Sequence, residues 1–419
     1  MLEDGQGLLG PPMAVGVSAK PQKVAVVVGA RPNFMKMGPV MAALKQHPDS
    51  FDPLLVHTGQ HYDATMSKVF LEELGIGDPD YSLGAGQGGD GNQTVRIMER
   101  LRPVFERERP DLILVPGDVT STLAAALVAV DMGITLGHVE AGLRSFDDGM
   151  PEEWNRVLTD SASDLLFTHS PEAREYLLSE GCPERSIHYV GNTMIDTLVA
   201  LRHRVQDQQS ALQHGMTAGE YLLVTLHRPA LVDGPLLEPV MEELVRLSAE
   251  IPVLFPVHPR TRKAIQRMDC VAGAAGLRLV EPQGYLSFLS LLEDAQGVLT
   301  DSGGIQEEAT YLGVPCLTLR ENTERPATVT TGTNMLLGLR PHMVAEVPAL
   351  LEEIRAKPSR VPPLWDGRAA ERIVNVLAAQ PLHAGATAAA PAAHRQGHAA
   401  NELVRATPTP TPPLAAEGV

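Results

Sequence analysis

The chain has 419 residues, of which 44% are hydrophobic and 20% are charged, and its formal net charge is −17. This composition is typical of a soluble globular protein with room for two domains. The negative charge argues against nucleic acid or an anionic membrane as a general partner, although a local basic cleft can still bind an anionic small ligand. Three widely spaced cysteines form no metal motif and no disulfide framework, which favours a reducing cytoplasm.

Composition divides the chain into three zones. Residues 1–21 are expected to be a disordered leader, and they lack the basic region and apolar core of a signal peptide. No apolar run approaches the length of a transmembrane helix. Residues 22–378 are expected to fold. The Ala-, Pro- and Thr-rich tail at 379–419 can hardly bury a core and is expected to be disordered.

The folded zone begins with a first series of apolar strands that alternate with helical segments. This alternation predicts a parallel sheet with helices on both faces. The predicted helical segments include 35–47, 64–74, 92–107 and 121–132. The predicted strands are 23–28, 53–57, 112–116, 135–139, 165–168 and 188–190.

The pattern restarts after a charged, Gln-rich stretch at 201–213, which is expected to contain a helix and to mark the boundary between domains. The second series of predicted strands is 221–226, 253–256, 277–280, 297–300 and 314–319. The fold class is therefore predicted as α/β, with two Rossmann-like doubly wound domains at 22–200 and 201–378 that face a cleft. Ligands are expected beyond the carboxyl ends of the strands.

Small residues between the strand at 297–300 and a following helix form the most informative motif. Ser302, Gly303 and Gly304 leave backbone N–H groups free to approach a phosphate at the helix N-terminus. Glu308, one turn into the helix, can hold the two hydroxyls of a ribose. The motif therefore indicates a site for a nucleotide diphosphate, although an ordinary N-cap at Ser302 is the alternative interpretation.

Cationic and polar side chains follow the first two strands. Arg31 and Lys36 come directly after a glycine turn, where two cations suit a pyrophosphate leaving group, or else only solvate a helix end. Gln60 and His61 end the next strand, and they suit recognition of a sugar or a second nucleotide, or form a plain turn.

Acidic side chains gather at the ends of the later strands in the first series. Asp118 and Glu140 follow two of these strands, and Glu152 lies in the first turn of a helix begun by Pro151. Gathered carboxylates can raise one another's pKa and divide acid and base roles. The alternatives are an N-cap aspartate and acids that complement a helix dipole, and a Glu152–Arg156 pair one turn apart is also predicted.

The second series offers a histidine and an aromatic side chain. His227 follows the strand at 221–226 and can act as an acid or base or bind a phosphate, although a lone histidine is more often structural. Phe288 lies on a predicted helix before the Ser-Gly-Gly turn. It can stack on a base or fill the core.

Taken together, these segments resemble the non-hydrolysing UDP-N-acetylglucosamine 2-epimerase family over roughly residues 23–375. The resemblance is carried by ten segments in order: GARPNFMK, TGQH, GDVTST, HVEAGLRS, PEEWNR, GNTMID, TLHR, HPRTR, SGGIQEE and TERP. The family implies a glycosyltransferase-B-like fold, a UDP-sugar in the cleft and inversion at C2 of UDP-GlcNAc to give UDP-ManNAc. It implies no nicotinamide cofactor and no metal, and it suggests a homodimer that serves polysaccharide biosynthesis.

The resemblance also implies roles for particular residues, and it leaves the acid and base roles undivided among the carboxylates. The implied catalytic residues are Asp118, Glu140, Glu152 and His227. The implied UDP-sugar contacts are Arg31, Lys36, Phe288, Ser302, Gly303, Gly304, Glu308 and Arg325.

The chain departs from the family pattern at several positions. Asn92, Pro229 to Leu231 and Ala327 stand near positions that bind a second substrate molecule as activator in some bacterial members. Gln60, His61, Gln93 and Arg228 are expected to remain from such a site, while its other charged contacts are replaced, so activation by substrate is predicted to be lost. Related epimerases of a diacetamido sugar nucleotide, a hydrolysing relative, a glycosyltransferase of the same fold and an inactive nucleotide-sugar binding protein remain the alternatives.

Overall fold

The computed structural model describes residues 20–60, 76–86, 92–266, 268, 274–358 and 360–380. The predicted helix at 64–74, His61, and almost all of the predicted leader and tail lie outside these ranges. Within them, no helix combines the length and the apolar character needed to cross a bilayer.

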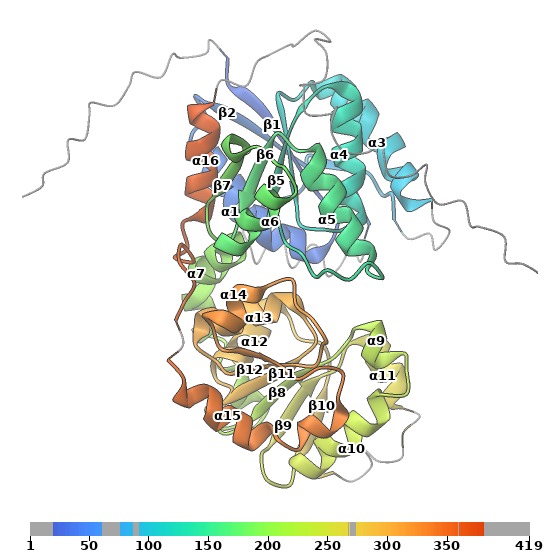
Figure 1. Cartoon of the computed structure of the whole chain (residues 1–419), viewed down its shortest axis with the longest axis vertical. Coiled ribbons are helices and arrows are strands. Elements are labelled where there is room, and N and C mark those ends of the chain that lie inside the picture. Colours follow the sequence, from blue (N-terminus) through green and yellow to red (C-terminus); the bar gives the residue numbers. More distant parts are fainter. Residues whose placement is uncertain are drawn as a thin grey trace, which may run out of the picture. The chain divides into compact units, whose positions relative to one another are not determined.

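The first sheet has seven parallel strands in the order β3-β2-β1-β4-β5-β6-β7 (Figure 1). Its central strands are buried on both faces, as expected when helices cover both sides. The strands are Gln22–Val28 (β1), Phe51–His57 (β2), Tyr81–Ser82 (β3), Leu112–Pro116 (β4), Thr135–Val139 (β5), Leu165–Thr168 (β6) and Ile187–Tyr189 (β7).

The second sheet has six parallel strands in the order β10-β9-β8-β11-β12-β13. They are Leu222–Thr225 (β8), Val253–Pro256 (β9), Leu277–Val280 (β10), Gly297–Thr300 (β11), Cys316–Thr318 (β12) and Asn334–Leu336 (β13). Both sheets are doubly wound: the strands are added outward on one side of the first strand and then outward on its other side. The predicted fold class is confirmed, and the sequence missed only the short edge strands β3 and β13.

Helices follow the strands in both halves, as the alternation predicts. Those of the first half are Arg31–Lys45 (α1), Gln93–Glu108 (α3), Thr120–Met132 (α4), Pro151–Ala162 (α5), Pro171–Ser179 (α6) and Thr193–Gln206 (α7). Those of the second half are Ser210–Gln213 (α8), Pro229–Val232 (α9), Leu237–Leu247 (α10), Pro259–Ile265 (α11), Tyr285–Glu293 (α12), Gly303–Leu312 (α13), Pro326–Thr330 (α14), Val347–Ala356 (α15) and Ala369–Ala379 (α16).

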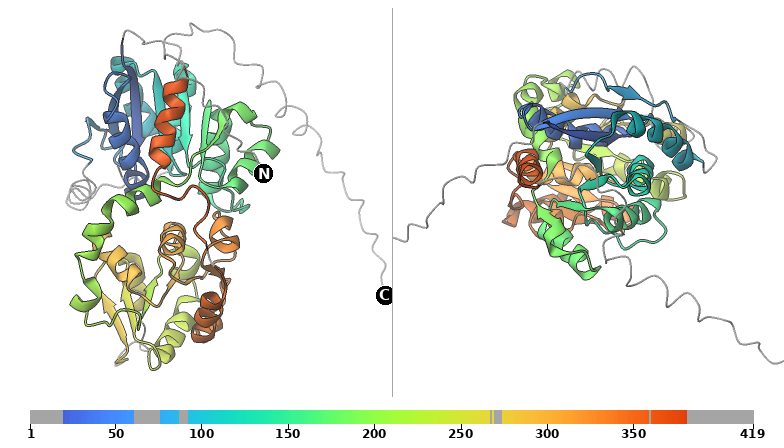
Figure 2. Two further views of the ribbon diagram at one scale, coloured as in Figure 1. Left: turned by 90° about the vertical axis from the view of Figure 1, so that its left-hand side faces the viewer. Right: turned by 90° about the horizontal axis from the view of Figure 1, so that it is seen from above.

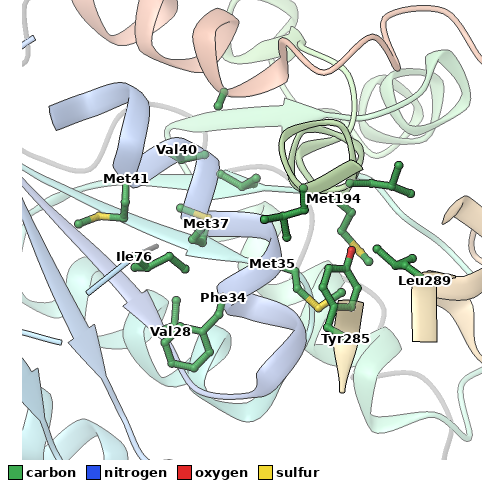
Figure 3. Packing of buried hydrophobic residues seen from close by; sticks show 14 of the residues in the cluster. Val28, Phe34, Met35, Met37, Val40, Met41, Ile76, Met194, Tyr285 and Leu289 are labelled. Atoms are coloured by element: carbon green, nitrogen blue, oxygen red, sulfur yellow. The ribbon is translucent and has the colours of Figure 1, made fainter. Parts of the chain in front are cut away.

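Helices α7 and α16 join the two halves. Helix α7 runs through residue 201 and packs against α1 of the first half, against α12 and α13 of the second half, and against α16, which comes last in the chain. Helix α16, although last in the chain, lies beside the first sheet and packs against α1 (Figure 2). Buried side chains of Met35 on α1, Met194 on α7 and Tyr285 on α12 meet here, so one apolar cluster spans both halves (Figure 3).

The site is positioned where the strand order of each sheet reverses, at the first strand of that sheet and its two neighbours. In the first sheet β1 pairs with both β2 and β4, and in the second β8 pairs with both β9 and β11. Loops that leave such neighbouring strands in opposite directions open a crevice at their carboxyl ends. Arg31 and Asp118 follow β1 and β4, and His227 and Ser302 follow β8 and β11.

Candidate active site

A cavity of about 570 Å³ is lined by residues from both halves of the chain. Most residues singled out in the sequence line it: Arg31, Lys36, Gln60, Asp118, Glu152, His227, Arg228, Phe288, Ser302, Gly303, Gly304, Glu308 and Arg325. Acidic residues of the first half and the Ser-Gly-Gly turn of the second half therefore line one space. This volume suits a small-molecule ligand.

The Ser-Gly-Gly turn begins helix α13 as predicted. Ser302 is the N-cap residue, yet its side chain makes no capping hydrogen bond, and its backbone N–H donates to the Thr300 hydroxyl at 3.0 Å. A Cβ atom on Gly303 would lie 2.4 Å from the Arg325 guanidinium and 2.8 Å from a Glu324 oxygen. Glycine is therefore required for the turn to approach Arg325 so closely.

Glu308 lies buried on the first turns of α13 and lines the cavity. The Tyr285 hydroxyl donates a hydrogen bond to Glu308 Oε1 at 3.1 Å. Burial and, to a smaller extent, the neighbouring Glu307 raise the pKa of Glu308 to about 8, against the opposing effects of Tyr285 and Arg31. The carboxyl group can thus exchange a proton near neutral pH.

Its neighbour Glu307, which the sequence analysis did not single out, has the opposite environment. Burial alone would raise its pKa, but Arg325, His169 and Lys36 lower the pKa to about 2. The Arg325 Nε atom lies 3.1 Å from Glu307 Oε1, and His169 Nε2 lies 3.3 Å from the same oxygen. Since His169 follows β6, this carboxylate links the two halves.

Asp118 lies in the loop between β4 and α4 and does not cap the helix, because the N-cap residue is Val119. Its carboxylate is hydrogen-bonded to the buried Arg156, and its carbonyl accepts from Asn155 Nδ2 at 2.8 Å. Arg156 also donates to Glu153 at 2.5 Å. The predicted Glu152–Arg156 pair is wrong, because Arg156 turns toward the buried face while Glu152 is exposed at the start of α5.

Glu140 does not line the cavity itself, although it was predicted with the other two carboxylates. It is buried behind two cations that do line it, forming an ion pair with Lys36 and accepting from Arg325 at 3.0 Å. Its φ of 71° is left-handed, which is uncommon for glutamate and indicates a residue held by its surroundings.

Arg325 is the centre of a buried network of charges. Besides Glu140 and Glu307 it contacts Glu324, which in turn accepts from Arg320 at 2.7 Å. Arg228 Nη2 lies 3.8 Å from Glu324 as well. Positive side chains therefore gather around the Ser-Gly-Gly turn despite the negative charge of the whole chain.

His227 is oriented by a buried carboxylate at the end of β11. Its Nδ1 lies 3.0 Å from Asp301 Oδ1, and Asp301 Oδ2 accepts the backbone N–H groups of His227 and Arg228, both at 2.8 Å. Burial would raise the pKa of Asp301, but these contacts lower it. An ionised Asp301 beside Nδ1 favours the tautomer that keeps the proton on Nδ1, so Nε2 is the ring atom available to a ligand in the cavity.

The residues predicted for a second substrate molecule do not form one group. Gln60 lines the cavity but accepts from the backbone N–H and hydroxyl of Ser121 at 3.0 and 2.7 Å, so it fixes the start of α4. Arg228 lines the cavity and donates to the Asp301 carbonyl at 2.9 Å. Gln93 begins α3 and is not among the lining residues, and His61 lies outside the described residues.

Several lining residues escaped the sequence analysis. Gln283 lies just before α12, and Tyr285 is the first residue of this helix, which also carries the half-buried Phe288. Met194 lies in the first turn of α7. A tyrosine and a methionine inside apolar patterns read as core, and only the tertiary structure shows that one edge of each side chain faces a cavity.

The chain has two doubly wound sheets, and one nucleotide-sized cavity lies where the strand order of each sheet reverses. These features define an α/β enzyme of the glycosyltransferase-B-like architecture. Comparison with known proteins refines this class. Residues 42–378 match the family described as UDP-N-acetylglucosamine 2-epimerase. The chain belongs to this family, whose members are isomerases.

Relatives from three organisms illustrate the match. A UDP-N-acetylglucosamine 2-epimerase of Methanococcus maripaludis is 40% identical over 85% of this chain and 98% of its own. A UDP-2,3-diacetamido-2,3-dideoxy-D-glucuronate 2-epimerase of Pseudomonas aeruginosa is 40% identical over 77% of this chain and 90% of its own. The structure of the Methanocaldococcus jannaschii UDP-GlcNAc 2-epimerase in complex with UDP-GlcNAc and UDP has a TM-score of 0.77 and 38% identity, covering 85% of this chain and 99% of that one.

Proposed function

We propose that this enzyme inverts C2 of UDP-N-acetylglucosamine to give UDP-N-acetylmannosamine, by elimination and re-addition of UDP through 2-acetamidoglucal. The observation that carries the proposal is that Asp118 and Glu152 share one cavity with Ser302, Glu308 and Arg325. Carboxylates for proton transfer thus face a turn suited to a diphosphate. Relatives at 40% identity that carry the corresponding names support the same substrate class.

The chemistry requires this pairing because the C2 proton of the sugar is not acidic. In the forward step a carboxylate takes the C2 proton, the bond between C1 and the UDP oxygen breaks, and a C1=C2 double bond forms. In the return step a proton is delivered to the opposite face of C2 while the UDP oxygen bonds to C1. Asp118, Glu140 and Glu152 share the acid and base roles, and His227 assists near the phosphates.

The cations and the nucleotide contacts are assigned on the same basis. Lys36 and Arg325 hold the departing diphosphate with Arg31, and the N–H groups of Gly303 and Gly304 approach its oxygens. Glu308 accepts hydrogen bonds from the ribose hydroxyls, and Phe288 contacts the uracil. In the described structure Lys36 and Arg325 neutralise Glu140. A diphosphate that draws either cation away therefore frees the Glu140 carboxylate from an ion pair.

A modified UDP-diacetamido sugar is the second candidate substrate. The 40% identity to the Pseudomonas aeruginosa diacetamido epimerase equals that to the Methanococcus maripaludis enzyme, so overall similarity favours neither sugar. A glycosyltransferase of the same fold is less favoured, because three carboxylates at one rim suit proton transfer rather than acceptor binding.

Incubation with UDP-GlcNAc in D2O, followed by proton NMR, tests the proposal. Deuterium at C2 of both UDP-epimers is the expected result. Release of free ManNAc and UDP would indicate a hydrolase, and no change without an added acceptor would contradict epimerisation. A parallel incubation with the diacetamido sugar nucleotide decides between the two substrates through the ratio of kcat/KM values.

We also propose a cytoplasmic homodimer with folded domains at 22–200 and 201–378. Exposed apolar side chains on the adjacent helices α4 and α5, Leu127, Trp154 and Leu158, support a self-association surface there. Light scattering coupled to gel filtration should give twice the mass of the chain. A Leu158→Glu substitution should shift the mass to that of the monomer, whereas Leu212→Glu, at an exposed leucine in the second half, should leave the dimer unchanged.

A further inference from the structure

A cluster of charged side chains, three of them buried, lies outside the set of residues that line the cavity. It consists of His138 on β5, Asp160 on α5, Arg144 in the loop after β5, and Glu180 at the end of α6, and it is called here the His138 cluster. His138 is 0% exposed, Asp160 is 1% and Arg144 is 2%. None of the four residues lines the cavity.

Both ring nitrogens of His138 have close hydrogen-bond partners. Its Nδ1 lies 2.7 Å from Asp160 Oδ1, and its Nε2 lies 2.7 Å from the carbonyl oxygen of Gly117. A carbonyl only accepts hydrogen bonds, and a carboxylate does the same. Asp160 is held as a carboxylate by Arg144 at 2.8 Å and by the backbone N–H of Gly142 at 3.1 Å. Both partners of the His138 ring can therefore only accept hydrogen bonds.

These hydrogen bonds end on the two loops that carry Asp118 and Glu140. Gly117 directly precedes Asp118, and its N–H donates to the Val139 carbonyl at 2.9 Å while its own carbonyl accepts from His138. Glu140 lies between His138 and Gly142, both of which bind Asp160. One carboxylate on α5 thus fixes both loops through charged hydrogen bonds.

The loop conformations need such restraint. Gly117, Glu140 and Gly142 have φ values of 62°, 71° and 79°, so each chain turns sharply as it leaves its strand. Left-handed conformations of residues other than glycine persist only where the surroundings hold them. His138 and Asp160 contact both loops, at the Gly117 carbonyl and the Gly142 N–H, without lining the cavity.

We infer that the pair His138 and Asp160 is a positioning device for the proposed epimerase, which sets the places of Asp118 and Glu140 relative to the sugar. This inference rests on the proposed function, because the two acids act on the sugar only in that reaction. A displacement of about 1 Å at reacting groups can reduce turnover on the order of 10²-fold. Loss of the device should therefore lower kcat and leave UDP binding almost unchanged.

Matched substitutions separate positioning from simple core stability. Asp160→Asn weakens the hold on both loops, whereas Asp164→Asn is the control, because Asp164 accepts the Leu136 N–H at 2.9 Å near the other end of the same strand. His138→Gln keeps a donor that can reach the Gly117 carbonyl, and His138→Asn keeps only a donor directed at Asp160. Measurements are kcat, KM, the Kd of UDP by calorimetry, and Tm.

We expect kcat to fall about 10-fold or more in Asp160→Asn and His138→Asn, while KM and the Kd of UDP stay within about threefold of wild type. In His138→Gln, kcat should recover in part. The Asp164→Asn control should keep kcat within about twofold, whatever its Tm. Normal kcat in both Asp160→Asn and His138→Asn, or equal losses in Asp164→Asn, would overturn the inference while wild type stays active. A wild type without epimerase activity would instead overturn the proposed function.

Discussion

The two walls of the cavity hold their carboxylates in different ways. On the wall from the first sheet, Asp118 is paired with Arg156, and Glu140, buried behind this wall, is paired with Lys36 and Arg325. On the wall from the second sheet, Glu308 has a tyrosine hydroxyl as its direct partner and a second carboxylate beside it. The charges of Asp118 and Glu140 are thus balanced by cations, whereas the pKa of Glu308 is left at about 8.

This difference matches two separate tasks. A group that takes or delivers a proton at a fixed place needs a fixed position, which ion pairs and charged hydrogen bonds supply. A group that recognises a ribose needs to accept hydrogen bonds when the ligand arrives. A carboxyl group whose pKa lies close to the ambient pH can do so after it loses one proton. The predictions below test this division, from the largest expected effect to the smallest.

Asp118→Asn should lower turnover about 10²- to 10⁴-fold, because the amide cannot exchange the proton. The Kd of UDP should change little, since Asp118 belongs to the wall assigned to the sugar. Steady-state kinetics and calorimetry measure the two effects. Turnover near that of wild type would contradict the assignment of the carboxylates.

Arg325→Ala should destabilise the protein by about 3–5 kcal/mol, the range for breaking a buried charge network from one side. It leaves Glu140, Glu307 and Glu324 without their shared partner. UDP affinity should fall as well, because a cation for the diphosphate is lost. Urea unfolding and calorimetry give both values, with Arg325→Lys as the variant that keeps the charge. An unchanged UDP affinity would refute the placement of Arg325.

Glu308→Gln should change the pH dependence of stability. The pKa of Glu308 in the folded protein is about 8, above its ordinary value of 4.5. Its contribution to stability is therefore complete below about pH 4.5 and is lost as pH rises through about 8. The variant lacks this titration, so its Tm relative to wild type should increase from pH 5 to pH 9. A constant difference in Tm across that interval would show that Glu308 is ionised throughout.

Ser302→Ala should have the smallest effect and should appear only with ligand. The Ser302 hydroxyl makes no capping hydrogen bond, so the Tm of the unliganded protein should stay within about one degree of wild type. If the hydroxyl contacts the diphosphate, the Kd of UDP should rise about 2- to 10-fold, the range for one neutral hydrogen bond. A loss of Tm without a change in Kd would make Ser302 a structural cap instead.

The periodic pattern of the chain was enough for the architecture and for the edge at which the site lies. Strand bounds such as 112–116, 135–139 and 165–168 agree with β4, β5 and β6. Buried parallel strands are continuous apolar runs, and the polar residues directly after them must lie at the same edge of a sheet. For this reason Asp118 and Ser302 could be placed at the cavity from their positions in the chain.

Partners across the fold could not be read in this way, because they depend on which faces of distant elements meet. Local spacing suggested a Glu152–Arg156 pair, whereas packing of α5 turned Arg156 toward Asp118 and Glu153. The sequence likewise offered no sign that the neighbours Glu307 and Glu308 would differ, yet their pKa values are shifted in opposite directions. The sequence by itself determined the sheets and their functional edge, since hydrophobic periodicity is a local property. Only the tertiary structure decided the protonation and pairing of each acid, since burial and long-range contacts set those free energies.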